Sequence, residues 1–194
     1  MHVSEAVAGR RRVLSATVGF VAGAGIVGLA IPFVAAWRPS ARAKAVGSAV
    51  EINVKKIEPG AMVTVEWQGK PVFILRRTPN QLSVLSSPAH AAKLRDPDSS
   101  VNNQPDYVKN NHRSIRPEIF VCVGVCTHLG CVPEYKKTGL QEDNDALYFC
   151  PCHGSKFDMA GRVYKGVPAP TNLIVPPHHY IENTILVIGS SENV

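Results

Sequence analysis

The chain has 194 residues and a net charge of +6, and 45% of its residues are hydrophobic, which fits one globular domain with an apolar segment attached. Beyond the N-terminus no lysine and arginine run is interleaved with aromatic residues, so the charge does not indicate nucleic-acid binding. Aromatic residues make up only 7%, while Gly and Pro number 15 each. This composition is typical of short strands and turns and argues against a helical bundle.

The first feature of the chain is an apolar segment at 13–37, which we expect to be a transmembrane anchor. Residues 13–36 carry no charge, and a helix over them would span roughly 36 Å, more than the ~30 Å hydrocarbon core of a bilayer. Trp37 closes the segment, as an interfacial aromatic residue does. A cleaved secretory signal is the alternative, because 41–43 (ARA) resembles a cleavage site. The apolar region is longer than the roughly 7–15 residues of such signals.

The basic residues beside this segment bear on its orientation. Three arginines at 10–12 precede it and three basic residues within 38–44 follow it, so the positive-inside rule decides nothing. Residues 9–14 (GRRRVL) resemble a twin-arginine export signal, a route that carries folded proteins. We therefore expect residues 1–12 in the cytoplasm, one crossing of a bacterial inner membrane, and the bulk of the chain on the periplasmic side.

A tether and a β-rich domain are predicted after the anchor. Residues 38–48 (RPSARAKAVGS) are small and polar and predict a flexible tether, and 49–194 form the domain that follows it. Three segments at the start of this domain are strand-like and separated by turn residues: 50–57 (VEINVKKI), 62–67 (MVTVEW) and 71–75 (PVFIL). Period-two alternation with turns between predicts an antiparallel meander of these three.

The rest of the domain also reads as mostly β. Residues 118–125, 147–149 and 184–188 are strand-like, 88–94 can form a short helix, and the polar stretch 96–116 predicts a long loop. The sequence therefore predicts a mostly β fold with one or two short helices.

Four of the five cysteines lie in two boxes, 126–131 (CTHLGC) and 150–155 (CPCHGS), and each box contains one histidine. Two cysteines and two histidines can hold zinc in a tetrahedral site. That arrangement leaves two thiols spare in an exported domain, where free thiols oxidise. Two disulfides would instead leave both histidines without a role.

The paired boxes resemble those of the Rieske proteins. In that family one cysteine and the histidine of each box bind a [2Fe–2S] cluster, with two thiolates on one iron and two imidazoles on the other. Carried over to this chain, the resemblance implies four ligands: Cys126 and Cys150 on one iron, His128 and His153 on the second. It also implies a disulfide between Cys131 and Cys152, which agrees with export to an oxidising compartment.

The resemblance extends to a fold and a function. It implies a Rieske-type antiparallel β sandwich with an inserted cluster-binding subdomain at about 118–170, preceded by a single N-terminal transmembrane helix. The disulfide cysteines, the anchor and 166–170 (GVPAP) are similar to the iron–sulfur subunit of quinol–cytochrome c reductase. A membrane-tethered Rieske ferredoxin-like subunit that serves another oxidoreductase is the alternative function.

In that family the cluster takes an electron, together with a proton, from quinol at a site on cytochrome b and passes the electron to a c-type cytochrome. The resemblance implies the same partners here, in a dimeric complex that contributes to proton translocation. His153 is expected to be the catalytic residue that meets the quinol. The head is then expected to move on the 38–48 tether.

Four neighbouring residues are expected to surround the cluster. The resemblance implies that Leu129 shields it and touches cytochrome b, that the Ser155 hydroxyl donates to a bridging sulfide, and that Pro168 belongs to a covering loop. Many respiratory relatives carry at position 157 a tyrosine that donates to a ligating cysteine. Phe157 lacks that donor, so we expect a lower reduction potential.

The remaining cysteine and histidines receive structural interpretations. Cys122 alternates with valines in a strand and predicts a small buried core residue. The five histidines outside the boxes are predicted to be surface loop residues: His2, His90, His112, His178 and His179.

Overall fold

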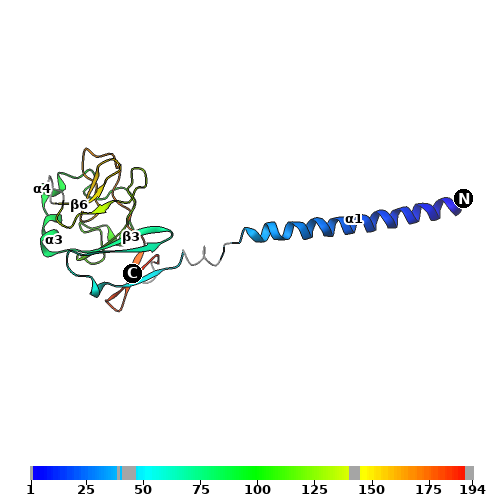
Figure 1. Ribbon diagram of the computed structural model, residues 1–194, viewed down its shortest axis with the longest axis horizontal. Coiled ribbons are helices and arrows are strands. Elements are labelled where there is room, and N and C mark those ends of the chain that lie inside the picture. The colour runs from blue at the N-terminus through cyan, green and yellow to red at the C-terminus, as the bar shows by residue number, and fades with distance from the viewer. Residues whose placement is uncertain (1, 39, 41–46, 140–144, 191–194) are drawn as a thin grey trace. The chain divides into compact units, whose positions relative to one another are not determined.

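The computed structural model describes the chain except residues 1, 39, 41–46, 140–144 and 191–194 (Figure 1). The side chains of 1–6 are not described either. The chain divides into two compact units, Met1–Ala45 and Val46–Val194.

The first unit consists of one long helix, α1 (His2–Ala36), with Pro32 inside it. Within it, Val7–Ala36 has a mean hydropathy of 2.2 and is long and apolar enough to cross a membrane. Its large apolar side chains are exposed, including Phe20 at 79% and Phe33 at 73%. Apolar side chains that find no protein partner within the described chain fit a lipid environment. Most of the predicted tether, 38–48, lies outside the described residues.

The second unit contains, among the described residues, three antiparallel sheets of three strands. The first has the order β1 (Val50–Asn53), β9 (Ile185–Ile188), β8 (His178–Ile181). The second has the order β2 (Met62–Trp67), β3 (Lys70–Arg76), β4 (Ile119–Val123). The third has the order β5 (Glu134–Tyr135), β6 (Ala146–Cys150), β7 (Ser155–Asp158). The mostly antiparallel β fold predicted from the sequence is confirmed.

The predicted meander of the first three strands is only partly correct. Strands β2 and β3 form a hairpin through Gln68 and Gly69, whose φ angles of 52° and 71° fit a two-residue turn. Strand β1 instead pairs with β9, with Val50 opposite Ile188. It ends at Asn53, whose side chain accepts from the Lys55 N–H and begins the short 3-10 helix η1 (Val54–Lys56). The expected strand of eight residues is therefore shorter.

The β2-β3-β4 sheet is the middle layer, with a core on each face. Val72 and Ile74 of β3 pack with Leu186 and Ile188 of the β1-β9-β8 sheet. The alternate residues of β3 and β4, among them Phe73 and Phe120, pack on the other side with residues of the β5-β6-β7 sheet and the cysteine loops. Cys122 belongs to this second core and is fully buried, so its predicted core role is confirmed.

The long connection between β3 and β4 carries the short helices, α3 (Pro79–Leu85), α4 (Pro88–Ala91) and the 3-10 helix η2 (Asp106–Val108). The sequence analysis predicted the helix near 88–94 but not α3. Thr78 caps α3 in a capping box with Gln81, a signal readable in the sequence. Three of the histidine interpretations are wrong. His90 is buried, and His178 and His179 are not in a loop but lie buried in β8, a strand that the sequence patterns did not indicate.

Candidate metal centre

The 126–131 box forms a loop that closes on itself directly after β4. The Cys126 N–H donates to the Cys131 carbonyl over 2.7 Å, and the Gly130 N–H donates to the Cys126 carbonyl over 3.0 Å. Gly130 adopts a φ of +83°, a conformation that favours glycine. These bonds direct the side chains of the loop to the end of the domain where the second box lies.

The 150–155 box is the turn between β6 and β7. Cys150 is the last residue of β6 and pairs with Ser155, the first residue of β7. The Gly154 N–H donates to the Cys150 carbonyl over 2.9 Å, with Gly154 at a φ of +76°. The turn thus places Cys150 at the base of the loop and His153 near its tip.

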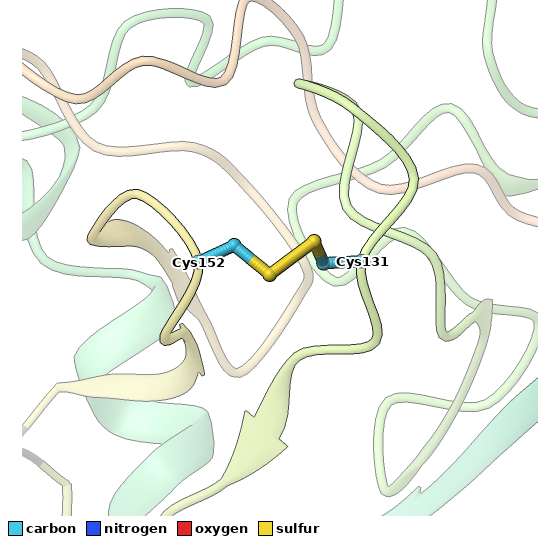
Figure 2. Close-up of a disulfide and its surroundings, with 2 residues drawn as sticks. All are labelled: Cys131 and Cys152. Atoms are coloured by element: carbon cyan, nitrogen blue, oxygen red, sulfur yellow. A yellow bond between two sulfur atoms is a disulfide. The ribbon is translucent and has the colours of Figure 1, made fainter.

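A disulfide between Cys131 and Cys152 joins the two loops side by side, as Figure 2 shows. This is the pair that the resemblance implies. The bridge links positions 21 residues apart in sequence. It therefore fixes the loop that leads from β4 to β5 against the turn between β6 and β7.

The other two box cysteines lie beneath the bridge, each only 2% exposed. The Sγ atoms of Cys131, Cys150 and Cys152 lie within 4.8 Å of one another, and the thiols of Cys126 and Cys150 share a hydrogen bond. Burial raises the pKa of the Cys150 thiol, whereas hydrogen bonds from the N–H groups of Cys152 and His153 lower it. The same N–H groups can stabilise a thiolate that binds a metal.

The two box histidines contact each other. The rings of His128 and His153 are 4.7 Å apart between centroids and almost perpendicular, at 89°. His153 is exposed, whereas His128 is partly buried. The Nδ1 atom of His128 is buried and finds no hydrogen-bond partner in the described chain. A buried ring nitrogen without a partner, beside a pair of buried thiols, fits a metal centre with two sulfur and two nitrogen ligands.

Ser155 ties a second segment to this site. Its fully buried Oγ accepts a hydrogen bond from the Ala169 N–H over 3.0 Å, which holds 166–170 beside the loops and leaves the hydroxyl proton free to donate. Ala169 is buried while Pro168 is exposed. The sequence analysis missed a similar contact of Thr127, whose Oγ1 donates to the Thr171 carbonyl over 2.7 Å.

The two predicted apolar neighbours lie in opposite environments. Leu129 is 70% exposed at the tip of the first loop. Phe157 is fully buried in the core that contains Cys126 and Cys150. Its cross-strand partner Tyr148 was not singled out from the sequence; its hydroxyl is buried without a hydrogen-bond partner in the described chain.

Comparison with known proteins decides among the metals that such a donor set can hold. A family model for the Rieske [2Fe-2S] domain matches residues 48–177. The chain belongs to the Rieske family. This match covers both boxes and the segment held by Ser155.

Named relatives in the Rieske family match over most of the chain. The chain is 50% identical to the "Ubiquinol-cytochrome c reductase iron-sulfur subunit" of Allochromatium vinosum, over 93% of this chain and 88% of that protein. It is 40% identical to the protein of the same name from Rhodospirillum rubrum, over 85% of each. A solved structure, "Hyperthermophilic respiratory Complex III", is 28% identical, with a TM-score of 0.49, over 88% of this chain and 98% of that chain.

Proposed function

We propose that this chain is the electron-transfer subunit of a quinol–cytochrome c reductase and carries one [2Fe–2S] cluster. The observation that supports this most strongly is the convergence of the two boxes on one disulfide-bridged site, in a Rieske chain half identical to a subunit of that name. The four ligands in this proposal are Cys126, His128, Cys150 and His153.

The bound cluster would supply a one-electron acceptor whose potential is higher than that of all-cysteine clusters, because two ligands are neutral imidazoles. The residues of the chain provide two further properties, a water-excluding environment for the cluster and a site for proton transfer. Cys126 and Cys150 keep the sulfur side dry because both are buried. His153, the exposed ligand, takes the catalytic role: once its second ring nitrogen has lost its own proton, that nitrogen can accept a proton from quinol and release it later.

The exposed surface around the imidazoles fits a membrane partner. Leu129, next to His128 in the sequence, is 70% exposed, and Val132, next to Cys131, is 52% exposed, which provides apolar contact area. We assign this surface to cytochrome b, where the quinol binds, and a later contact to a c-type cytochrome, within a dimeric complex that contributes to proton translocation.

The first unit supports an anchored location. We propose that α1 crosses a bacterial inner membrane once, with residues 1–12 in the cytoplasm and the head on the periplasmic side after twin-arginine export. The supporting observations are the apolar helix and the GRRRVL segment before it. Residues 38–48 then serve as the tether that lets the head move between the two cytochromes.

Copurification tests the main proposal. The full chain, tagged at the C-terminus and extracted from its native membranes in mild detergent, is expected to bring with it a b-type cytochrome and quinol–cytochrome c reductase activity. A chain that carries its cluster but copurifies with a different oxidoreductase would contradict the proposal in favour of the ferredoxin-like alternative.

The tether has its own test. Prolines introduced over 40–47 are expected to slow quinol–cytochrome c turnover and leave the spectrum of the cluster intact, because they stiffen the segment. Serines at the same positions are the matched control. Unchanged turnover in the proline variant would contradict head movement on this segment.

A further inference from the structure

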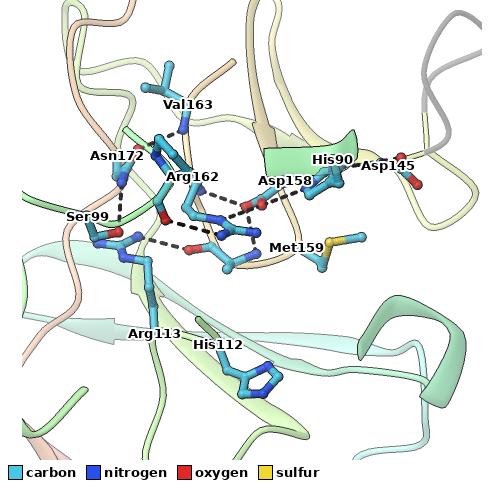
Figure 3. A network of polar contacts seen from close by, with 12 residues as sticks. His90, Ser99, His112, Arg113, Asp145, Asp158, Met159, Arg162, Val163 and Asn172 are labelled. Carbon is cyan, nitrogen blue, oxygen red and sulfur yellow. Dashed lines mark hydrogen bonds and ion pairs between the residues drawn. The ribbon is translucent and has the colours of Figure 1, made fainter. Parts of the chain in front are cut away.

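The described part of the domain buries more positive than negative charge. Its fully buried ionic side chains are three arginines and one aspartate, namely Arg77, Arg113, Arg162 and Asp158, each at most 2% exposed. Three of them, Arg113, Arg162 and Asp158, lie in one polar network around the end of β7 (Figure 3), and Arg77 joins it through the carbonyl of Met159. Burying a charge without a partner is unfavourable, so an excess of buried cations requires a physical explanation.

Asp158 is already bound to other partners. Its carboxylate accepts from Arg162 Nε over 2.8 Å and contacts His90 Nε2 at 3.0 Å. It also accepts from the N–H groups of Ala160 and Arg162. The pKa of Asp158 falls to about 2: burial alone would raise it, and Arg162 and His90 more than compensate. Asp158 is thus ionised at neutral pH and forms its ion pair with Arg162. His90, predicted to lie on the surface, is buried in this network.

Within the described chain, the hydrogen bonds of Arg77 and Arg113 go to neutral oxygen atoms, and the Arg77 guanidinium also lies over the Phe120 ring. Arg77 donates to the Ser114 hydroxyl and to three carbonyls, those of Met159, Pro117 and His112. Arg113 donates to Gln104, to Asn103 and to the carbonyls of Ala160 and Leu173. Burial lowers the pKa of each to about 10, so both stay charged at neutral pH.

These two charges lie within electrostatic range of the metal centre. Arg77 holds the carbonyl of Met159, one residue beyond β7, and the other end of β7, Ser155, pairs with Cys150. An extended chain of that length spans at most about 14 Å. The two guanidiniums also act on the buried Cys122 thiol, which packs in the same core as Cys126 and Cys150.

We propose that Arg77 and Arg113 are built-in countercharges that stabilise the reduced form of the centre and raise its reduction potential. This rests on the proposed function, because it requires the [2Fe–2S] cluster. With two ferric ions, two sulfides and two thiolates, an oxidised cluster is neutral, and one electron from quinol makes it an anion. Neither arginine gains or loses a proton in this step.

The size of the effect follows from the distance. The cross-strand step to Cys150 and the hydrogen bond to the carbonyl add to the length of β7, so the charges lie within about 20 Å of the centre. With an effective dielectric constant of about 20, a unit charge at about 20 Å changes the equilibrium constant for reduction roughly fourfold. The guanidiniums also fasten loop carbonyls to the domain, so deleting an arginine would mix structural and electrostatic effects. The decisive variant therefore changes the charge and keeps the hydrogen bonds.

Gln104→Glu is that variant. Gln104 is buried, its oxygen already accepts from Arg113 Nε, and its amide nitrogen finds no partner in the described chain. Glutamate keeps the acceptor, removes the unpaired amide group and neutralises the charge of Arg113 in place. Asn102→Asp is the matched control, because it adds the same charge at an exposed neighbouring position where solvent screens it.

The experiment is a redox titration of the full chain, followed by the EPR signal of the cluster. Gln104→Glu is expected to lower the equilibrium constant for reduction by roughly threefold to tenfold without lowering the melting temperature, and Asn102→Asp by less than about twofold. An equal shift in the two variants would overturn the proposal. Wild-type protein without a cluster signal would instead refute the proposed function, so the two failures are distinguishable.

A second pair of variants keeps the proposal testable if Gln104→Glu does not fold. Arg77→Lys and Arg77→Gln both lose the guanidinium fork, but only the second loses the charge. The lysine variant is expected to keep the higher potential of the two. Equal potentials in a folded pair would contradict the countercharge role and leave Arg77 a purely structural residue.

Discussion

The two sides of the metal centre differ sharply in their exposure. On the thiol side, Cys126 and Cys150 are each 2% exposed and pack into a core shared with Phe157. On the imidazole side, His153 is exposed and Leu129 is 70% exposed. The difference indicates a division of labour. In the proposed function, the buried side controls how strongly an electron is held, and the exposed side is where we expect a quinol and a proton to reach the site.

Replacing His153, the exposed residue among the four proposed ligands, is expected to have the largest effect on cluster binding. His153→Gln should abolish cluster binding, because glutamine does not replace the imidazole on iron. Bound iron and the EPR signal of the reduced full chain measure this. His112→Gln, outside both boxes, is the control and should keep the cluster. A His153 variant with normal iron content would show that this exposed imidazole is not a ligand.

Breaking the link between the two loops should have the next largest effect. The double variant Cys131→Ser, Cys152→Ser frees a loop of 21 residues, which corresponds to about 3 kcal/mol of unfolding free energy. Denaturant unfolding of the variant and of wild-type protein measures the difference, and a reductant should produce the same loss in the wild type. Equal unfolding free energies would mean that the disulfide does not stabilise the loops.

A smaller effect is expected on the buried side, at Ser155. Ser155→Ala removes the acceptor of the Ala169 N–H, and leaving that group unpaired costs about 2 kcal/mol of stability. It also removes the hydroxyl expected to donate to the cluster, so the reduction potential should fall. Thr127→Val loosens the same covering segment through Thr171 and should leave the potential nearly unchanged. Equal potentials in the two variants would rule out a direct role for the Ser155 hydroxyl.

On the buried thiol side, the smallest effect on the reduction potential is expected for a change at Phe157. Phe157→Tyr adds a hydroxyl in the core that contains Cys126, and a new hydrogen bond to that sulfur is worth about 1 kcal/mol, or roughly fivefold in the equilibrium constant for reduction. The potential should rise in a redox titration. Tyr148→Phe removes the neighbouring hydroxyl that has no partner in the described chain and is the control. A potential that stays constant in Phe157→Tyr would contradict the expected donor role.

Local sequence patterns predicted the residues of the site better than they predicted the pairing of strands in the sheets. The boxes brought out Cys126, His128, Cys150 and His153 because their spacing is specific. The structure places the two thiols against each other and the two imidazoles against each other, while the role of all four as ligands stays a prediction. The β2–β3 hairpin was also predicted, since its turn is two residues long. The pairing of β1 with β9 was missed because it joins the two ends of the domain and has no local signal.

Burial of polar residues was the least predictable part. His178 and His179 follow two prolines and resemble loop residues, yet β8 places them against β9. The network of Arg77, Arg113 and Asp158 unites segments from distant parts of the chain. Nothing in the local sequence distinguishes a buried arginine from an exposed one, because the partners are mostly backbone carbonyls.

Metal and sulfide analysis of the purified full chain, joined to low-temperature EPR after reduction, tests the central claim most directly. The account predicts two irons and two acid-labile sulfides per chain and a reduced-state signal typical of a histidine-ligated [2Fe–2S] cluster. One zinc ion per chain, with no such signal, would contradict it.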